Sequence, residues 1–445
     1  MEPEKSGWSR ISAALVENPE SLGLWENLIR EVESENGVPI SKVSSDEAVE
    51  ILRSCYDALL KKFPLLVHYW IRYAQWEFRL GHYQRAILVY ERALVHLRGS
   101  IELWTSYLQF RVDTISDNVG EIGELFETAR KTIGRHFYAH EFYQLYLLFI
   151  KSYATDDPQR QYHVLLRTII EQPIYHYNLF AKMFFSAISS VDATTIGYIV
   201  PPKAVRGYSG DFRQAQIKLK KLFTDVYITT QARSHQLYSY ERHLPRQYFD
   251  QTFVPQAQLK QWHNYLSFLE LNFPHNHTIQ VYERCVLVTA PYPEFWLRFA
   301  EFHISQDRML EAAEVLTRGL VYCASYKLLV KLVDVEITRK NYTRARDLLT
   351  EYVKEAADTP IPVLEKILSV ESLFHTQDAA VMRDLFVQVF RQSDSERGSE
   401  LLHYYALPKE AKSEIRSHLN VELKKEDESN YTEKFHQSLI GPTHN

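Results

Sequence analysis

One helical pattern recurs along this chain of 445 residues and limits what it can fold into. Between residues 68 and 97, three aromatic residues stand three positions apart, Trp70, Tyr73 and Trp76, and after Gly81 a second stripe centres on Tyr90. Spacings of three and four place such residues on one face of a helix. Each of these two helices needs a neighbour to bury its stripe, so the sequence predicts helical hairpins that stack on one another.

Copies of this hairpin follow at a nearly constant interval. Trp70 and Trp104 are 34 residues apart, and so are Trp262 and Trp296. This period is typical of stacked helix pairs of the tetratricopeptide kind. We predict that the following residues pack the repeats together: Trp25, Trp70, Tyr73, Trp76, Tyr90, Trp104, Tyr107, Phe110, Tyr143, Trp262, Tyr265, Tyr282, Trp296 and Phe299.

The repeats are interrupted once. Residues 186–212 are rich in Ser, Gly, Pro and Thr, which indicates a loop, and a long helix is expected after them. We therefore predict an all-α superhelix in two arms. Its parts are an N-terminal repeat arm at 1–185, a linker loop with its connecting helix at 186–256, a C-terminal repeat arm at 257–423 and a polar tail at 424–445.

Composition supports this class of fold and limits the function. Only 14 glycines are present, which leaves few loops that need positive φ. The net charge of −5 argues against a protein that coats nucleic acid over its whole surface. Three cysteines, without a CxxC pair, are expected to be buried in a reducing compartment. The chain shows no signal peptide and no run of eighteen apolar residues, so we expect no membrane span and a cytosolic or nuclear location.

Several residues invite a functional reading beside a structural one. The aromatic stripe could stack RNA bases, but its fixed repeat positions favour packing. The recurrent Glu77, Glu91 and Arg92 are expected to pair or cap helices rather than to catalyse. The run His275-Asn276-His277 is interpreted as a surface turn, because its spacing does not aim two imidazoles at one metal ion. No phosphate loop, nucleophile elbow or zinc-protease motif is present, so we predict no enzyme, no cofactor and no small-molecule substrate.

Two surfaces are candidates for contact with partners. A basic stretch is the best place for RNA or an acidic partner, although a solvated helix face also explains it; its members are Lys203, Arg206, Arg213, Lys218, Lys220 and Lys221. Apolar residues near the end of the array are candidates for a partner or dimer contact, because a terminal repeat has no next neighbour. These residues are Phe386, Phe390, Leu401, Leu402, Tyr404 and Tyr405.

The aromatic triplet with its glutamate, together with VYERAL at 89–94 and VYERCV at 281–286, resembles the half-a-TPR (HAT) repeat family. KKFPLLVHYWIRYAQWE (61–77) and AQLKQWHNYLSFLE (257–270) resemble the branch of that family found in the U1 snRNP. The resemblance implies a nuclear, non-enzymatic scaffold in pre-mRNA splicing that supports 5′ splice-site recognition by contacting U1 snRNP proteins.

The same resemblance implies a homodimer, or a heterodimer with a HAT paralogue, through the C-terminal arm, and RNA contact that is indirect or minor. Two alternatives stay open. One is a HAT scaffold of another machine, for mRNA 3′-end cleavage and polyadenylation or for ribosomal RNA processing. The other is a helical-repeat subunit of an enzyme such as a prenyltransferase, which would need a catalytic partner subunit.

Overall fold

The computed structural model describes residues 7–35, 38–115, 118–154, 156–190, 196–199, 212–355 and 359–374. These residues are helical apart from the turns and one short hairpin, so the predicted all-α fold is confirmed. The described residues up to Thr289 form one compact unit, and those from Ala290 onward form a second. None of the described helices is both long and apolar enough to cross a membrane.

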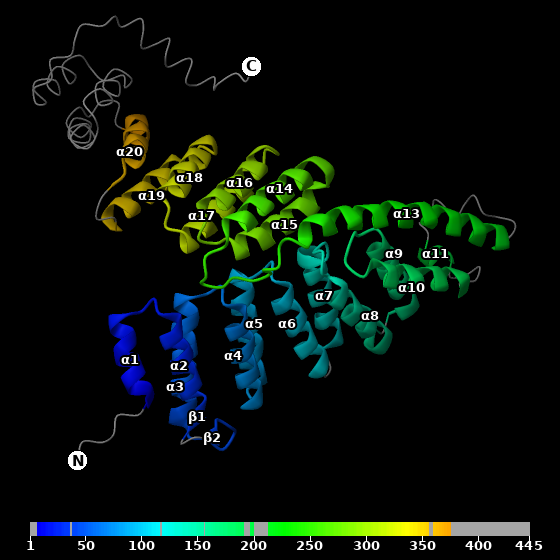
Figure 1. Cartoon of the computed structure of the whole chain (residues 1–445), viewed down its shortest axis with the longest axis horizontal. Helices are drawn as coiled ribbons and strands as arrows, with labels where there is room; N and C mark the ends of the chain where they lie inside the picture. The colour runs from blue at the N-terminus through cyan, green and yellow to red at the C-terminus, as the bar shows by residue number, and fades with distance from the viewer. Residues whose placement is uncertain are drawn as a thin grey trace, which may run out of the picture. The chain divides into compact units, whose positions relative to one another are not determined.

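The first unit is a succession of helices in chain order (Figure 1). They are α1 (Gly7–Glu17), α2 (Leu22–Val32), α3 (Asp46–Lys62), α4 (Val67–Arg79), α5 (Tyr83–His96), α6 (Ile101–Asp113), α7 (Val119–Ile133), α8 (His140–Tyr153), α9 (Pro158–Ile170), α10 (Tyr177–Ser190), α11 (Ile196–Ile199), α13 (Phe212–Glu241), α14 (Gln256–Asn272) and α15 (His275–Val288). Each pair folds as a hairpin, and first helices also pack on the next first helices, α4 on α6 and α6 on α8. This is how a helical repeat buries stripes that one hairpin leaves open.

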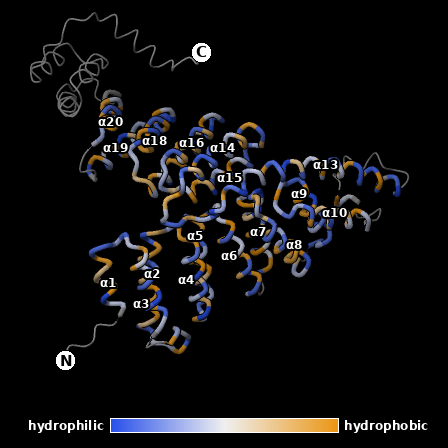
Figure 2. Tube along the Cα trace, in the orientation of Figure 1, coloured by the Kyte–Doolittle hydropathy of each residue, from blue (hydrophilic) through white to orange (hydrophobic). Residues whose placement is uncertain are grey.

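The second unit continues the same architecture. Its helices are α16 (Pro293–Ile304), α17 (Met309–Tyr322), α18 (Tyr326–Thr338), α19 (Tyr342–Glu355) and α20 (Ile361–Phe374). Here too, α16 packs on α18 and α18 on α20, in addition to the contacts between consecutive helices. Figure 2 shows hydrophobic and hydrophilic residues alternating along the individual helices of both units, as amphipathic packing requires.

Local sequence explains where the helices begin and turn. The Ser45 and Ser100 side chains accept hydrogen bonds from Ala48 N and Leu103 N, which caps the starts of α3 and α6. Gly81 adopts a φ of 89° between α4 and α5, a conformation that favours glycine. The segment after α2 contains a short hairpin in which β1 (Ser34–Glu35) pairs antiparallel with β2 (Val38–Pro39).

The predicted division into arms at residues 186–256 stays a prediction. Within the first unit, α13 packs against α10 and α9, and Phe184 meets Phe223 edge to face at 4.7 Å between ring centroids. The long helix expected after the interruption is therefore present, and it packs on the helices that precede it.

Candidate functional site

Tryptophan at the first repeat position forms the same hydrogen bond in four repeats. The indole N–H donates to the backbone carbonyl six residues earlier, at 2.8–3.0 Å, in the pairs Trp25–Pro19, Trp70–Pro64, Trp104–Arg98 and Trp296–Ala290. These carbonyls lie in the turn before the helix. Because a buried indole N–H needs an acceptor, the bond fixes the turn between repeats to the helix that follows it.

An arginine lies over the same ring in three repeats. The guanidinium carbon of Arg92 is 5.5 Å from the Trp70 ring, that of Arg284 is 5.0 Å from Trp262, and that of Arg318 is 5.7 Å from Trp296. Each arginine comes from the second helix of its own repeat, 22 positions after the tryptophan. The cation–π contact therefore closes each hairpin on itself.

Aromatic side chains of one repeat stack on those of the next. Tyr56 stacks on Tyr73 and Tyr90 on Tyr107, both at 4.9 Å between ring centroids. The structure buries most of the residues assigned to repeat packing, and only Trp25 and Phe110 are partly exposed. Buried rings whose faces already lie against other rings offer no platform for bases.

Recurrent carboxylates hold neighbouring helices together. Arg53 of α3 forms a two-point pair with Glu77 of α4, at 2.7 and 3.0 Å, and Arg346 of α19 forms the same pair with Glu371 of α20. The buried Glu33 accepts hydrogen bonds from Tyr56, Trp76 and Arg72. These carboxylates are committed to donors from other helices, which is a structural use.

A deeply buried ion pair joins the end of the long helix to a repeat. Glu241 of α13 accepts two hydrogen bonds from Arg284 of α15, at 2.9 and 2.6 Å, and one from the Tyr265 hydroxyl at 2.8 Å. Burial raises the pKa of Tyr265 well above its usual value, and the charge of Glu241 raises it further. Tyr265 therefore stays a neutral donor, and Glu241 and Arg284 compensate each other's charge away from water.

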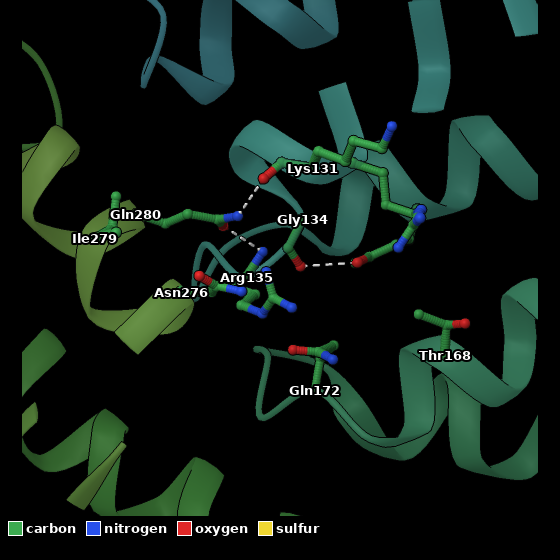
Figure 3. Close-up of a pocket in the computed structure, with 10 residues that line it drawn as sticks. Lys131, Gly134, Arg135, Thr168, Gln172, Asn276, Ile279 and Gln280 are labelled. Carbon is green, nitrogen blue, oxygen red and sulfur yellow. Dashed lines mark hydrogen bonds between the residues drawn. The ribbon is translucent and has the colours of Figure 1, made fainter. Parts of the chain in front are cut away.

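A pocket of about 450 Å³ lies in the first unit, between segments distant in sequence (Figure 3). Its lining comes from the end of α7 and the turn after it, from α8, from the end of α9 and from the first turns of α15. The lining residues are Arg130, Lys131, Gly134, Arg135, Tyr143, Thr168, Gln172, Asn276, Ile279 and Gln280.

Gln280 holds the two sides of this pocket together. Its Nε2 donates to Lys131 O at 2.7 Å, and its Oε1 accepts from Arg135 N at 2.7 Å (Figure 3). The Tyr143 hydroxyl donates to Gly134 O at 2.8 Å. One amide side chain from α15 thus binds both the last turn of α7 and the turn that follows it.

The charge lining the pocket is positive. Arg130 is neutralised by Glu127, at 2.8 Å; burial would raise the pKa of Glu127, but hydrogen bonds from Arg130 and Tyr146 outweigh it and lower that pKa. Within the described part of the chain, Lys131 and Arg135 form no ion pair, and no lining residue is acidic. Glu127 also interacts with the charge of Lys131, so three cationic lining side chains face one nearby carboxylate and the pocket keeps a net positive charge.

The remaining sequence candidates fall in different places. Arg213, Lys218, Lys220 and Lys221 are all exposed on α13, opposite or beside the face that buries Leu219 and Phe223. Lys203, Arg206 and all of the apolar candidates of the C-terminal end lie outside the described residues; the latter are Phe386, Phe390, Leu401, Leu402, Tyr404 and Tyr405.

The interpretation of residues 275–277 as a surface turn is wrong. His275 starts α15, and His277 is 3% exposed, with its ring against Phe273 at 4.7 Å. Pro274 is the N-cap residue of α15. The helix therefore begins directly after it, and residues 275–277 form the first turn of the helix. The described residues include no group of three or more His, Cys, Asp or Glu side chains that could hold a metal ion.

The cysteines differ from one another. Cys285 is buried in α15, as expected, whereas Cys55 and Cys323 are partly exposed and Cys323 caps the end of α17 rather than lying within a helix. None of the three, which all lie among the described residues, forms a disulfide bond. Burial raises the pKa of Cys55 to about 11 and also raises that of Cys323, so neither is an activated nucleophile.

These features define a helical-repeat protein whose aromatic residues and buried carboxylates serve packing. The model of the PRP39 N-terminal HAT repeat matches residues 9–185, and the model of the PRP39 C-terminal HAT repeat matches residues 235–372. The chain therefore belongs to the PRP39 family of HAT-repeat proteins.

Similar curated proteins agree with this family. The chain is 27% identical to pre-mRNA-processing factor 39 of Schizosaccharomyces pombe, over 70% of this chain and 54% of that protein. It is also 27% identical to the U1 small nuclear ribonucleoprotein component PRP42 of Saccharomyces cerevisiae, over 79% of this chain and 67% of that protein. The chain thus spans about half to two thirds of these relatives. The match to the crystal structure of CSTF-77 covers 84% of this chain and 88% of the CSTF-77 chain, with 12% sequence identity and a TM-score of 0.44.

Proposed function

We propose that this protein is a non-enzymatic scaffold of the U1 snRNP, acts in pre-mRNA splicing in the nucleus and supports 5′ splice-site recognition through protein contacts. The observation that carries the proposal is the match of both PRP39 HAT-repeat models along the chain. Relatives named as a pre-mRNA-processing factor and a U1 snRNP component support the same process.

The chemistry of the repeats supports a scaffold rather than an RNA-binding platform. The aromatic residues that could stack bases instead pack against other aromatic rings between the helices, as the stacked pairs Tyr56–Tyr73 and Tyr90–Tyr107 illustrate. The carboxylates that could act as acids or bases are bound to arginines, as in Arg53–Glu77. What remains for partners is the polar surface of the helices, which suits protein recognition by an extended array.

We also propose that the protein associates with a second copy, or with a HAT paralogue, through its C-terminal arm. Phe386, Phe390, Leu401, Leu402, Tyr404 and Tyr405 are the candidate contacts, and the exposed Arg213, Lys218, Lys220 and Lys221 of α13 are the candidate site for minor RNA contact or an acidic partner. In this proposal, pairing with the pre-mRNA belongs to the snRNA, and the protein contributes no base contacts.

The decisive experiment is affinity purification of the tagged full chain from its own cells, followed by mass spectrometry and RNA sequencing. Enrichment of U1 snRNA with U1 snRNP proteins is the expected result. Enrichment of 3′-end cleavage factors or of pre-ribosomal RNA instead would assign the scaffold to another machine. A stoichiometric catalytic subunit without any snRNA would favour the enzyme-subunit alternative.

A further inference from the structure

The pocket at the end of α7 has the size and charge of a ligand site. Its volume of about 450 Å³ lies within the usual range for ligand pockets. Three of its ten lining residues are cationic and none is acidic. Glu127 pairs with Arg130 and also interacts with the charge of Lys131, whereas Arg135 has no ion pair among the described residues, so the lining keeps positive charge for an anion from outside.

Backbone acceptors near the pocket do not compensate these charges. Positive side chains at the C-terminal end of a helix are usually stabilised by the free backbone carbonyl groups there. Here, however, Gln280 binds Lys131 O, Gly134 N binds Arg130 O, and the Tyr177 hydroxyl binds Ile170 O at the end of α9. The carbonyl groups that would repel an anion are therefore already bound to donors.

Further donors converge from the opposite side. Asn276 lies in the first turn of α15, where a helix favours negative charge. The side-chain amides of Asn276 and Gln172 make no hydrogen bond within the described ranges and are partly or fully exposed. Two cations and two amides thus border one concave site, a donor set suited to a group with several acceptor oxygens.

A phosphate ester fits this set better than a carboxylate or a nucleic-acid strand. It carries a charge of roughly −1.5 to −2 and three acceptor oxygens. An RNA-binding groove would need exposed aromatic side chains on which bases can stack. Tyr143 is the one aromatic residue of the lining. It is 1% exposed, and its hydroxyl donates a hydrogen bond to Gly134 O. The space beyond one phosphate can hold the flanking atoms of a peptide.

We propose that this pocket binds a phosphorylated serine or threonine side chain of a partner protein, with Arg135 and Lys131 as the main contacts to the phosphate. The proposal goes beyond the scaffold role and does not depend on the U1 snRNP being the right machine. Because Gln280 joins α15 to the α7 turn, the pocket exists only when these distant segments are docked. Only a chain whose first unit is folded would then bind the phosphorylated partner.

The test measures binding of the purified full chain to short Gly-Ser-rich peptides that carry one phosphoserine, each paired with its unphosphorylated twin, by isothermal titration calorimetry. We expect binding of the phosphorylated peptide alone. The double variant Lys131→Ala/Arg135→Ala should weaken it by roughly tenfold or more, since each lost contact is a charge-assisted hydrogen bond. The variant Lys61→Ala/Lys260→Ala removes the same charge from exposed positions of α3 and α14 and should bind like the wild type.

A second variant covers the case in which the double variant fails to fold, as judged by circular dichroism. Gln172→Glu adds a negative charge at a partly exposed lining position and should also weaken the phosphorylated peptide. Equal binding of both peptides, or undiminished binding by these variants, would overturn the proposal. So would oligouridylate binding that Lys131→Ala/Arg135→Ala abolishes while no phosphopeptide binds, because the site would then belong to RNA.

Discussion

At the scale of single residues, the first-position tryptophan combines two functions. Its ring fills the space between helices, and its N–H binds a turn carbonyl. Where the position holds tyrosine, the hydroxyl of Tyr143 reaches Gly134 O and that of Tyr177 reaches Ile170 O. In these six repeats a polar atom at the far end of a large ring binds a backbone carbonyl, which explains why both Trp and Tyr are suited to this position.

Substitutions at Trp104 separate these two functions. Trp104→Ala should lower the free energy of unfolding by about 3–5 kcal/mol, because it leaves a large cavity. Trp104→Phe keeps most of the ring but leaves Arg98 O without its donor and should cost about 1–3 kcal/mol. Urea denaturation measures both. An unchanged stability of Trp104→Ala would show that the residue does not pack the repeats.

The matched control for the hydrogen bond is Trp25→Phe. Trp25 donates to Pro19 O at 3.0 Å in the same way, but it is partly exposed, so water can replace the lost donor. We expect Trp25→Phe to cost less than Trp104→Phe. Equal losses at the two sites would mean that burial does not set the value of the bond.

The buried His277 should lower the free energy of unfolding of the protein in acid. Burial lowers its pKa to about 3, with help from Arg135 and Arg233, whereas an unfolded histidine titrates near pH 6.5. Below about pH 6.5 the unfolded chain therefore binds a proton that the folded chain does not, and stability falls as the pH is lowered. For this one histidine, the loss between about pH 7 and about pH 5 should approach roughly 2 kcal/mol.

The variant His277→Phe tests this contribution. His277 Nε2 is buried without a hydrogen bond among the described residues, and its ring already lies against Phe273. Phenylalanine should thus be tolerated at neutral pH and should flatten the decline in thermal midpoint toward pH 5. The buried His136, whose pKa is also lowered by burial, remains in both proteins and supplies the residual slope. Identical acid sensitivity of variant and wild type would contradict the assignment.

At the scale of helices, the pair Glu241–Arg284 ties the end of α13 to α15. Removing one charge of a fully buried pair leaves the other uncompensated, which typically costs about 3–5 kcal/mol. We therefore expect Glu241→Gln to destabilise the first unit by that amount in urea denaturation. In the exposed pair Lys331–Glu301, Glu301→Gln should change stability by less than about 1 kcal/mol.

A double variant decides whether charge compensation is the cause. Replacing both partners, in Glu241→Leu/Arg284→Met, removes the buried charges together and should recover much of the loss of Glu241→Gln. The recovery is expected to be incomplete, because the Tyr265 hydroxyl also loses its acceptor. A double variant that is less stable than Glu241→Gln would show that packing around these side chains outweighs their charge.

Sequence periodicity reveals the contacts within a repeat but not those between distant segments. The spacing of Trp70 and Trp104 predicts the helix pairs, and VYERCV marks Arg284 as a repeat residue. Its partner Glu241 lies 43 positions earlier, in the long helix α13, and no spacing predicted from the sequence connects the two residues. The pocket could not be predicted from the sequence for the same reason, because Gln280 and Lys131, which form a hydrogen bond beside it, are 149 positions apart.

At the scale of the whole molecule, a stack of repeats is stabilised by nearest neighbours, and its last member lacks one. The sequence predicts an apolar end at Phe386, Phe390, Leu401, Leu402, Tyr404 and Tyr405, outside the described residues. A second chain that packed on these residues would remove their apolar side chains from water. Burial of these side chains is the physical argument for the proposed dimer.

Sedimentation of three proteins tests the dimer: the full chain, a truncation at Ser393 and the full-length double variant Phe386→Asp/Phe390→Asp. We expect the full chain to sediment as a dimer, and both altered proteins as monomers with the helical content of their remaining repeats. The double variant keeps the chain length, so it separates lost contacts from lost mass. A full chain that sediments as a monomer at every concentration would exclude self-association. The heterodimer would then be tested by adding the paralogue, with complex formation lost in Phe386→Asp/Phe390→Asp if the same end binds it.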